Sequence, residues 1–240
     1  AGMFSVVALS LDGLRERHNA IRGSSKSFEQ VRAAAAVLRA CSQRFGIIHT
    51  LCSESLDEVE EIAELASEWG ASLLQLHPLE PTATNLSRFR MVPLSAEERL
   101  DAYLLATIVA DRFPHMYIQL DLVHREIARR LPHAIHGAPL KEPMAPRELV
   151  LEETGQLVPL TYGLGRAFAV TDVHGIPLAD AWASYLESRW GTLRGALRRA
   201  CVAVARGVHG EVVAWHEIVR QYAGRVAADE RAVRFDHVAA

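Results

Sequence analysis

The sequence predicts an α/β fold in which a parallel sheet is followed by a smaller α+β appendage, and three observations point to it. An apolar run over residues 4–11 is too short for a helix and ends in the polar groups Ser10 and Asp12, as a buried parallel strand does. Up to residue 122, such runs alternate with amphipathic segments, which indicates right-handed βαβ units. After residue 147 the pattern changes to a hairpin and long helical stretches.

Local signals justify each element of the first part. Strands are predicted at residues 4–11, 45–51, 71–77 and 116–122, and helices at residues 28–43, from residue 56 to Gly70, and from residue 96 to about 113. Ser27 is expected to cap the first of these helices, since Ser favours that position. The capping-box spacing occurs twice, in Ser55 with Glu58 and in Ser95 with Glu98; each pair predicts a helix start.

The second part begins after a proline-rich stretch. Residues 132–147 hold four prolines and Gly137, which is typical of a linker. We therefore predict three regions, residues 1–131, the linker 132–147, and a C-terminal region over residues 148–240. That region is expected to contain a hairpin over 148–161 that turns at Thr154-Gly155, a further strand within 162–173, a helical stretch over 178–206 interrupted at Gly191 and Gly195, and a last helix over 211–228.

Composition excludes several classes of protein. The net charge of −3 and a pI near 6.4 give no footprint for nucleic acid or for a membrane surface. Apolar runs stay short of the ~20 residues that a membrane helix needs. The three cysteines, Cys41, Cys52 and Cys201, are far apart in the sequence. This spacing favours a reducing, cytoplasmic setting and provides no local cysteine cluster for a metal.

Several short motifs occur in an order that resembles one family. The motifs are Ser10-Leu11-Asp12-Gly13, His18, Ile21-Arg22-Gly23 and Ser27-Phe28. Their order is similar to a segment of the radical S-adenosylmethionine (SAM, here AdoMet) enzymes. The branch it resembles contains the SPASM and twitch members, which make cofactors or modify peptides. Residues 73–83 look like the sixth strand of that family, and residues 148–160 resemble the start of its small C-terminal domain.

The resemblance implies both a fold and a reaction. Residues 1–131 would be the later strands of a partial (β/α)6 TIM-like barrel, and residues 148–240 a twitch-like appendage. The complete enzyme would use AdoMet and a [4Fe-4S] cluster to form a 5'-deoxyadenosyl radical that modifies a peptide or a small cofactor precursor. The substrate partner would thus be a peptide or a small molecule.

The sequence departs from the family in two respects. The Cys-x3-Cys-x2-Cys motif and the Gly-Gly-Glu element are absent, so we expect the cluster ligands upstream and this chain to be a C-terminal portion. Cysteines for an auxiliary cluster are absent from the C-terminal region too. The strand at residues 4–11 carries no charge or proline to protect an edge, so we expect it to be interior in a larger sheet.

Five residues are expected to bind the cofactor: Ser10, Asp12, Arg22, Thr50 and His77. Under the resemblance, the hydroxyl of Ser10 would contact a ribose, although a strand-end turn explains it equally well. Asp12 would shape the turn by accepting backbone N–H bonds. Arg22 suits a carboxylate because its guanidinium donates as a fork, or it lies in a solvated loop. Thr50 and His77 end strands where barrel ligands gather, but His77 also fits a hydrogen-bonded core residue.

Two other functions stay open at this point. The chain could be a catalytically inactive binding module derived from the same scaffold. It could also be an unrelated (β/α) barrel enzyme that uses His77 and nearby carboxylates. The sequence assigns neither a catalytic residue nor a metal ligand, and it leaves the oligomeric state open.

Overall fold

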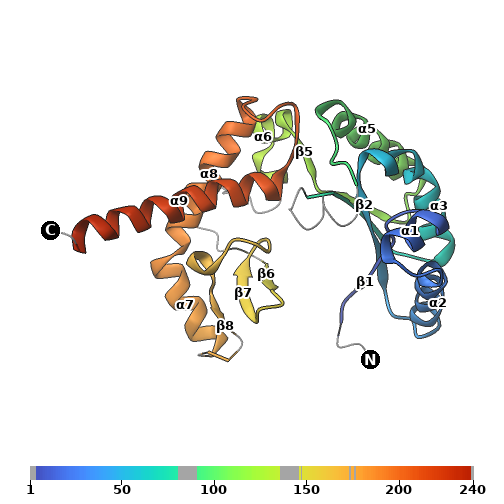
Figure 1. The fold of residues 1–240 in the computed structure, drawn as a ribbon, viewed down its shortest axis with the longest axis horizontal. Helices are drawn as coiled ribbons and strands as arrows, with labels where there is room; N and C mark the ends of the chain where they lie inside the picture. Colours follow the sequence, from blue (N-terminus) through green and yellow to red (C-terminus); the bar gives the residue numbers. More distant parts are fainter. Residues whose placement is uncertain are drawn as a thin grey trace. The chain divides into compact units, whose positions relative to one another are not determined.

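The chain divides into two compact units, Ala1–Leu122 and Val123–Ala240 (Figure 1). The computed structural model describes residues 4–80, 91–135, 146, 148–172, 174–175 and 177–238, with side chains described up to residue 228. Most of the predicted linker, namely residues 136–145 and 147, lies outside the described residues.

The first unit is an α/β layer built on four parallel strands, as predicted. Its elements are β1 (Val7–Ser10), α1 (Arg15–Arg22), α2 (Ser27–Ala40), β2 (Phe45–Leu51), the 3-10 turn η1 (Ser53–Glu58), α3 (Val59–Trp69), β3 (Leu73–Pro78), α5 (Ala96–Arg112) and β4 (Tyr117–Leu120). The sheet order is β1-β2-β3-β4, and each neighbouring pair is parallel. The four predicted strands and their parallel order are confirmed.

Side chains alternate between two faces of this sheet. One face packs under α2, α3 and α5 (Figure 1) and carries buried residues such as Ile47, Leu74 and Leu76. The other, which we call the open face, carries exposed Ala8 and Ser10 on β1. On this face, the side chains of β1 are therefore accessible to a ligand.

The start of the sheet differs from the prediction in its helices. Helix α1 was not predicted, because its sequence is almost entirely polar. Ser27 does not cap α2, since Lys26 occupies the N-cap position and its side chain makes no capping bond. Asn19 of α1 supplies the acceptor instead, and its Oδ1 lies 2.9 Å from the backbone N of Phe28.

One predicted capping box is confirmed and the other is wrong. Ser95 Oγ accepts from the backbone N–H of Glu98 at 3.2 Å, and Glu98 Oε2 accepts from that of Ser95 at 2.7 Å. Ser55, however, lies inside η1 and is buried. Its hydroxyl accepts from the backbone N–H of Cys52 at 3.0 Å, which leaves Glu58 free for another role.

The second unit combines helices with two small sheets. Its elements are β5 (Leu122–His124, starting at the boundary), α6 (Arg125–Arg130), η2 (Pro132–Ala134), β6 (Leu149–Leu151), β7 (Gln156–Pro159), η3 (Arg166–Phe168), β8 (Thr171–Asp172), α7 (Leu178–Ser188), α8 (Trp190–Ala205), β9 (Val212–Ala214) and α9 (Trp215–Val238). Strands β6, β7 and β8 form an antiparallel sheet in that order. The predicted hairpin is confirmed.

The helices of the second unit share one core, which includes Tyr185, Leu193, Leu197 and Trp215. The predicted stretch over 178–206 is two helices, α7 and α8, that meet at Arg189. Gly191 and Gly195 lie inside α8, so the prediction that they interrupt the helix is wrong. The last helix begins after the strand β9. None of the described helices combines the length and apolar character needed to cross a membrane.

Candidate functional site

The strand register arranges the open face in three rows. The rows are Ala8, Gly46, Leu73 and Tyr117; Ser10, Ile48, Gln75 and Gln119; and, at the carboxyl ends, Asp12, Thr50, His77 and Asp121. The rows become more polar toward the carboxyl ends of the strands. In α/β folds, ligands bind at that end, so we take the last row as the candidate site.

The first half of the site is a cluster around Asp12, which is buried. Its Oδ1 accepts from the hydroxyl of Thr50 at 3.0 Å, and its Oδ2 lies 2.6 Å from Nη2 of Arg22. The backbone N–H of Asp12 donates to Nδ1 of His18 at 3.1 Å. Burial lowers the pKa of His18, so this histidine is neutral and acts as an acceptor. The predicted backbone bonds to the Asp12 carboxylate are wrong, because side chains take that place.

Two further groups hold the turn that carries this cluster. The buried His49 on β2 donates from Nδ1 to the backbone oxygen of Leu11 at 2.8 Å, and burial lowers its pKa. Glu58 accepts from the backbone N–H of Leu14 at 2.8 Å and from Nε of Arg17 at 2.8 Å. The turn after β1 is therefore fixed by residues from β2 and η1.

The second half of the site is centred on the carboxylate of Asp121, which directly follows β4. Its Oδ2 accepts from Nε2 of Gln75 at 2.7 Å and from Nδ1 of His77 at 2.8 Å. Its Oδ1 accepts from Nε2 of Gln119 at 3.0 Å. On the other side of the imidazole, Glu80 Oε1 lies 3.6 Å from Nε2 of His77. The histidine thus lies between two carboxylates.

This geometry changes the charge of His77. Burial alone would lower the pKa of His77, but the carboxylates of Asp121 and Glu80 raise it from 6.5 to about 9. Burial also acts to raise the pKa of Asp121, yet the three donors lower it below its usual value. At neutral pH the pair is an imidazolium and a carboxylate, so this part of the site offers both charges.

The structure brings the predicted residues to one edge of the sheet. Asp12, Arg22 and Thr50 form one cluster, and His77 is the neighbour of Thr50 in the strand register. Ser10 lies in the row below and is exposed. Arg22, whose side chain is 44% exposed, keeps N–H donors for a ligand because a guanidinium has five. Together these groups suit a ligand that carries a carboxylate, a cation and hydroxyls.

Three residues of the site region were not predicted to belong to it: His49, Glu58 and Asp121. A signal for Asp121 was present, because Gln119 and Asp121 repeat on one strand the polar alternation of Gln75 and His77 on another. The roles of His49 and Glu58 depend on contacts across 38 and 44 residues of sequence. Local patterns carry no signal of that kind.

Metal ligands do not gather at this edge. Within the described part of the chain, no group of three or more His, Cys, Asp and Glu residues is arranged to hold a metal ion. Cys52 is buried, and burial raises the pKa of its thiol. A thiol of this kind packs as a small apolar side chain.

Solved structures of other proteins share this fold. Native anSMEcpe with bound AdoMet and Cp18Cys peptide, an anaerobic sulfatase-maturating radical SAM enzyme, matches with a TM-score of 0.55 and 14% identity. The match covers 95% of this chain and 70% of that chain. This chain shares its fold with a radical SAM enzyme. Native anSMEcpe with bound AdoMet matches with a TM-score of 0.52 and 14% identity, over 93% of this chain and 67% of that chain. No protein-family model and no curated protein matches the sequence.

Proposed function

We propose that the first unit supplies the later strands of a partial (β/α)6 barrel in a radical SAM enzyme of the SPASM or twitch branch, and that its open face binds AdoMet. The observation that carries the proposal is the row of Asp12, Thr50, His77 and Asp121 at the carboxyl ends of four parallel strands. The fold shared with AdoMet-bound anSMEcpe supports it.

The chemistry of the open face fits AdoMet. Arg22 would hold the ligand's carboxylate with its remaining N–H donors, while Asp12 orients the guanidinium. The hydroxyls of Ser10 and Thr50 would contact the ribose. AdoMet supplies a 5'-deoxyadenosyl radical when a reduced [4Fe-4S] cluster cleaves it.

The chain's residues do not fit the cluster itself. Within the described residues no metal-binding group occurs, and Cys41, Cys52 and Cys201 are spaced too far apart for a cluster motif. We therefore assign to this chain the binding and orientation of AdoMet, and place the cluster ligands outside it.

The proposed substrate is a peptide, with a cofactor precursor as the alternative. A similar structure, that of anSMEcpe, holds bound AdoMet and the Cp18Cys peptide, which supports the former. The imidazolium of His77 and the carboxylate of Asp121 would face this substrate from the third and fourth strands.

Calorimetric titration of the full chain with AdoMet tests the proposal. We expect saturable binding below 1 mM, and at least tenfold weaker binding after Arg22→Ala, since a hydrogen bond to a charged group contributes about 1.5–3 kcal/mol. Arg112→Ala is the matched control, because Arg112 is also half exposed and ion-paired but lies on α5. An absence of binding, or equal loss in both variants, would refute the proposal.

A further inference from the structure

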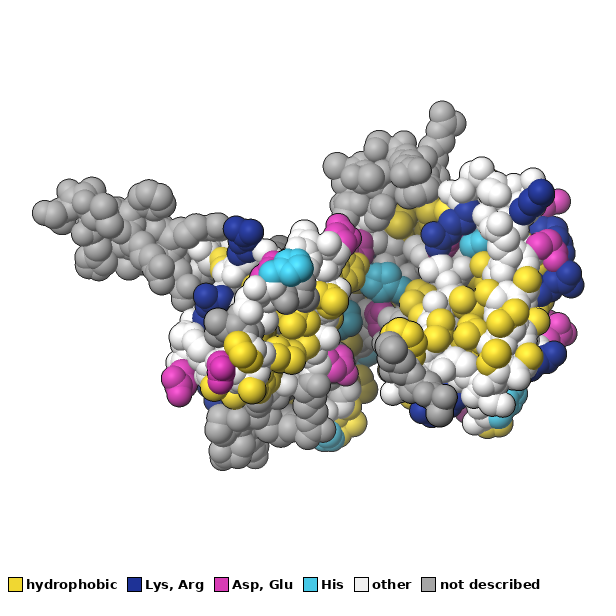
Figure 2. Space-filling model, turned by 90° about the horizontal axis from the view of Figure 1, so that it is seen from below, with side chains coloured by type: hydrophobic (Ala, Val, Ile, Leu, Met, Phe, Trp, Pro, Cys, Tyr) yellow, Lys and Arg dark blue, Asp and Glu magenta, His cyan; other side chains and the backbone are white. Residues whose placement is uncertain are grey.

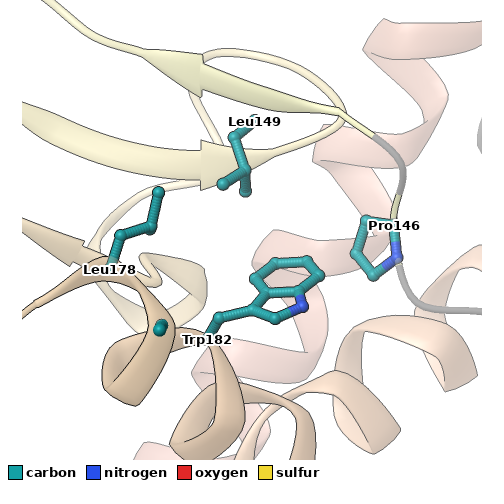
Figure 3. Close-up of a pocket in the computed structure, with 5 residues that line it drawn as sticks. Pro146, Leu149, Leu178 and Trp182 are labelled. Atoms are coloured by element: carbon teal, nitrogen blue, oxygen red, sulfur yellow. The ribbon is translucent and has the colours of Figure 1, made fainter.

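An apolar pocket lies in the second unit, and none of its lining residues belongs to the open face. Its volume is about 410 Å³, and its lining is Pro146, Leu149, Leu178, Ala179 and Trp182. Figure 3 shows the side chains of Leu149 from β6 and of Leu178 and Trp182 from α7 converging on one space. This volume is at the lower end of the ~300–1,000 Å³ range of ligand sites, and it suits a large side chain better than a cofactor.

The indole of Trp182 is a rigid wall of this pocket. It stacks on the ring of Tyr185 with centroids 5.8 Å apart and an interplanar angle of 17°. Tyr185 is buried in the core of the unit. A preformed aromatic wall lowers the entropic cost of binding.

Strand β6 forms the edge of its sheet beside the pocket. Among the described residues, β6 pairs with β7 alone. The backbone bonds from Glu152 to Gln156 (2.8 Å) and from Leu160 to Glu148 (3.1 Å) show that the even-numbered residues face β7. By alternation, the N–H and C=O groups of Leu149 and Leu151 point to the outer edge. Such an edge is a template for another strand.

The side chains along this edge are apolar and partly exposed. Leu149 and Leu151 lie on the same face of β6, and Leu149 lines the pocket. Leu151 and Leu178 are large apolar residues that stay about half exposed or more. Side chains at alternate positions of an added strand would therefore cover Leu151 and fill the pocket.

In the sequence between Arg147 and Arg189, which supplies most of the pocket lining, acidic residues outnumber basic ones. Residues 148–188 contain the acidic residues Glu148, Glu152, Glu153, Asp172, Asp180 and Glu187 and the single basic residue Arg166. Glu148 and Asp180 directly adjoin the lining residues Leu149 and Ala179. Figure 2 shows hydrophobic side chains gathered on the visible face of the second unit, with Asp and Glu side chains beside them and Lys and Arg side chains at the margin. A partner with basic residues would complement this field.

We propose that an extended peptide, in which basic residues alternate with apolar ones, adds to the outer edge of β6 and places one apolar side chain against Trp182. This is strand addition with a side-chain pocket for specificity. The inference deepens the peptide-modifying function proposed above, because it assigns substrate docking to the second unit.

A fluorescein-labelled nine-residue peptide, with Lys alternating with Leu and with Phe at its centre, tests this by fluorescence anisotropy on the full chain. We expect saturable binding that weakens at least tenfold when alternate backbone nitrogens of the peptide are methylated, or when Glu replaces its Lys residues. Leu178→Lys is expected to weaken binding at least tenfold. Leu104→Lys, at a similarly exposed leucine of α5, is expected to leave it unchanged.

Three results would overturn the proposal: no binding at 1 mM peptide, equal binding of the methylated peptide, or equal binding of the Glu peptide. The methylated peptide and the Glu peptide are tested on the unaltered protein. They therefore test strand addition and charge recognition even if Leu178→Lys does not fold. AdoMet titration of the Leu178→Lys variant separates the two sites. Loss of peptide binding with AdoMet binding retained supports the docking site, whereas peptide binding without AdoMet binding refutes only the function proposed for the open face.

Discussion

Replacing Asp121 by Asn would remove the negative charge that holds His77 protonated. The rise of the His77 pKa from 6.5 to about 9 corresponds to about 3 kcal/mol of preference for the imidazolium in the folded protein. Because the folded pKa lies above the unfolded one, this stabilisation is complete below pH 6.5 and is lost as the pH rises through about 9. In Asp121→Asn, we expect the pKa of His77 to fall by at least ~1 unit, with Glu80 retaining part of the elevation.

NMR titration of the His77 ring, followed between pH 5 and 10.5, measures this directly. Urea unfolding at pH 6.5 and 9.5 gives the linked change in the free energy of unfolding. Asp172→Asn is the control, because it removes one negative charge from an exposed position on β8 in the second unit. Titration of His77 near 6.5 in the unaltered protein, or the same pKa in Asp121→Asn, would show that the pair is not coupled in this way.

Three further predictions concern the first unit. Burial lowers the pKa of His18 and of His49, so the unfolded chain takes up protons at these residues before the folded protein does. The free energy of unfolding should therefore decrease as the pH falls from 6.5 to 5; a flat urea-unfolding profile over that range would contradict this. Leu74→Ala, at a fully buried position, should cost about 2–5 kcal/mol of unfolding free energy, and a cost no larger than that of Leu73→Ala on the open face would contradict it. Gly46→Ala should cost about 1–3 kcal/mol, because the new Cβ would lie 2.9 Å from Cβ, 3.0 Å from Cδ2 and 3.1 Å from Cγ of Leu73. In urea unfolding, the double variant with Leu73→Ala should recover only part of this cost, since alanine removes Cγ and Cδ2 but keeps Cβ.

The parallel sheet was predictable because its signal is local. The apolar runs at residues 45–51 and 71–77 are bounded by turn residues and separated by helices, and short crossovers leave few alternatives to a parallel order. Helix α1 was not predictable in this way. Its polar sequence is held by tertiary bonds, such as that of Glu58 to the backbone N–H of Leu14.

The break between α7 and α8 shows a second limit of local reasoning. Glycine costs about 1 kcal/mol within a helix, so Gly191 and Gly195 predict a break near them. The core contacts of Leu193 and Leu197 outweigh that cost and keep both glycines helical. The chain bends instead at Arg189, whose Nη1 donates to the backbone oxygen of Ala169 at 2.6 Å.

The candidate site was predictable in position but not in its pairing. Polar residues at strand ends indicated Asp12, Thr50 and His77, and the structure places all three in one row. The partner of His77 is Asp121, 44 residues further along the chain. Their coupling depends on the register of β3 and β4, which no local pattern specifies.

Amide hydrogen exchange of the full chain with and without AdoMet measures whether the carboxyl ends of the four parallel strands bind this ligand. If the open face binds AdoMet, the ligand should slow exchange in residues 10–23 and 49–58, which carry Ser10, Asp12, Arg22 and Thr50, and should leave residues 148–172 unchanged. Unchanged exchange at saturating AdoMet, or protection confined to the second unit, would contradict the claim that the carboxyl ends of these strands form the AdoMet site.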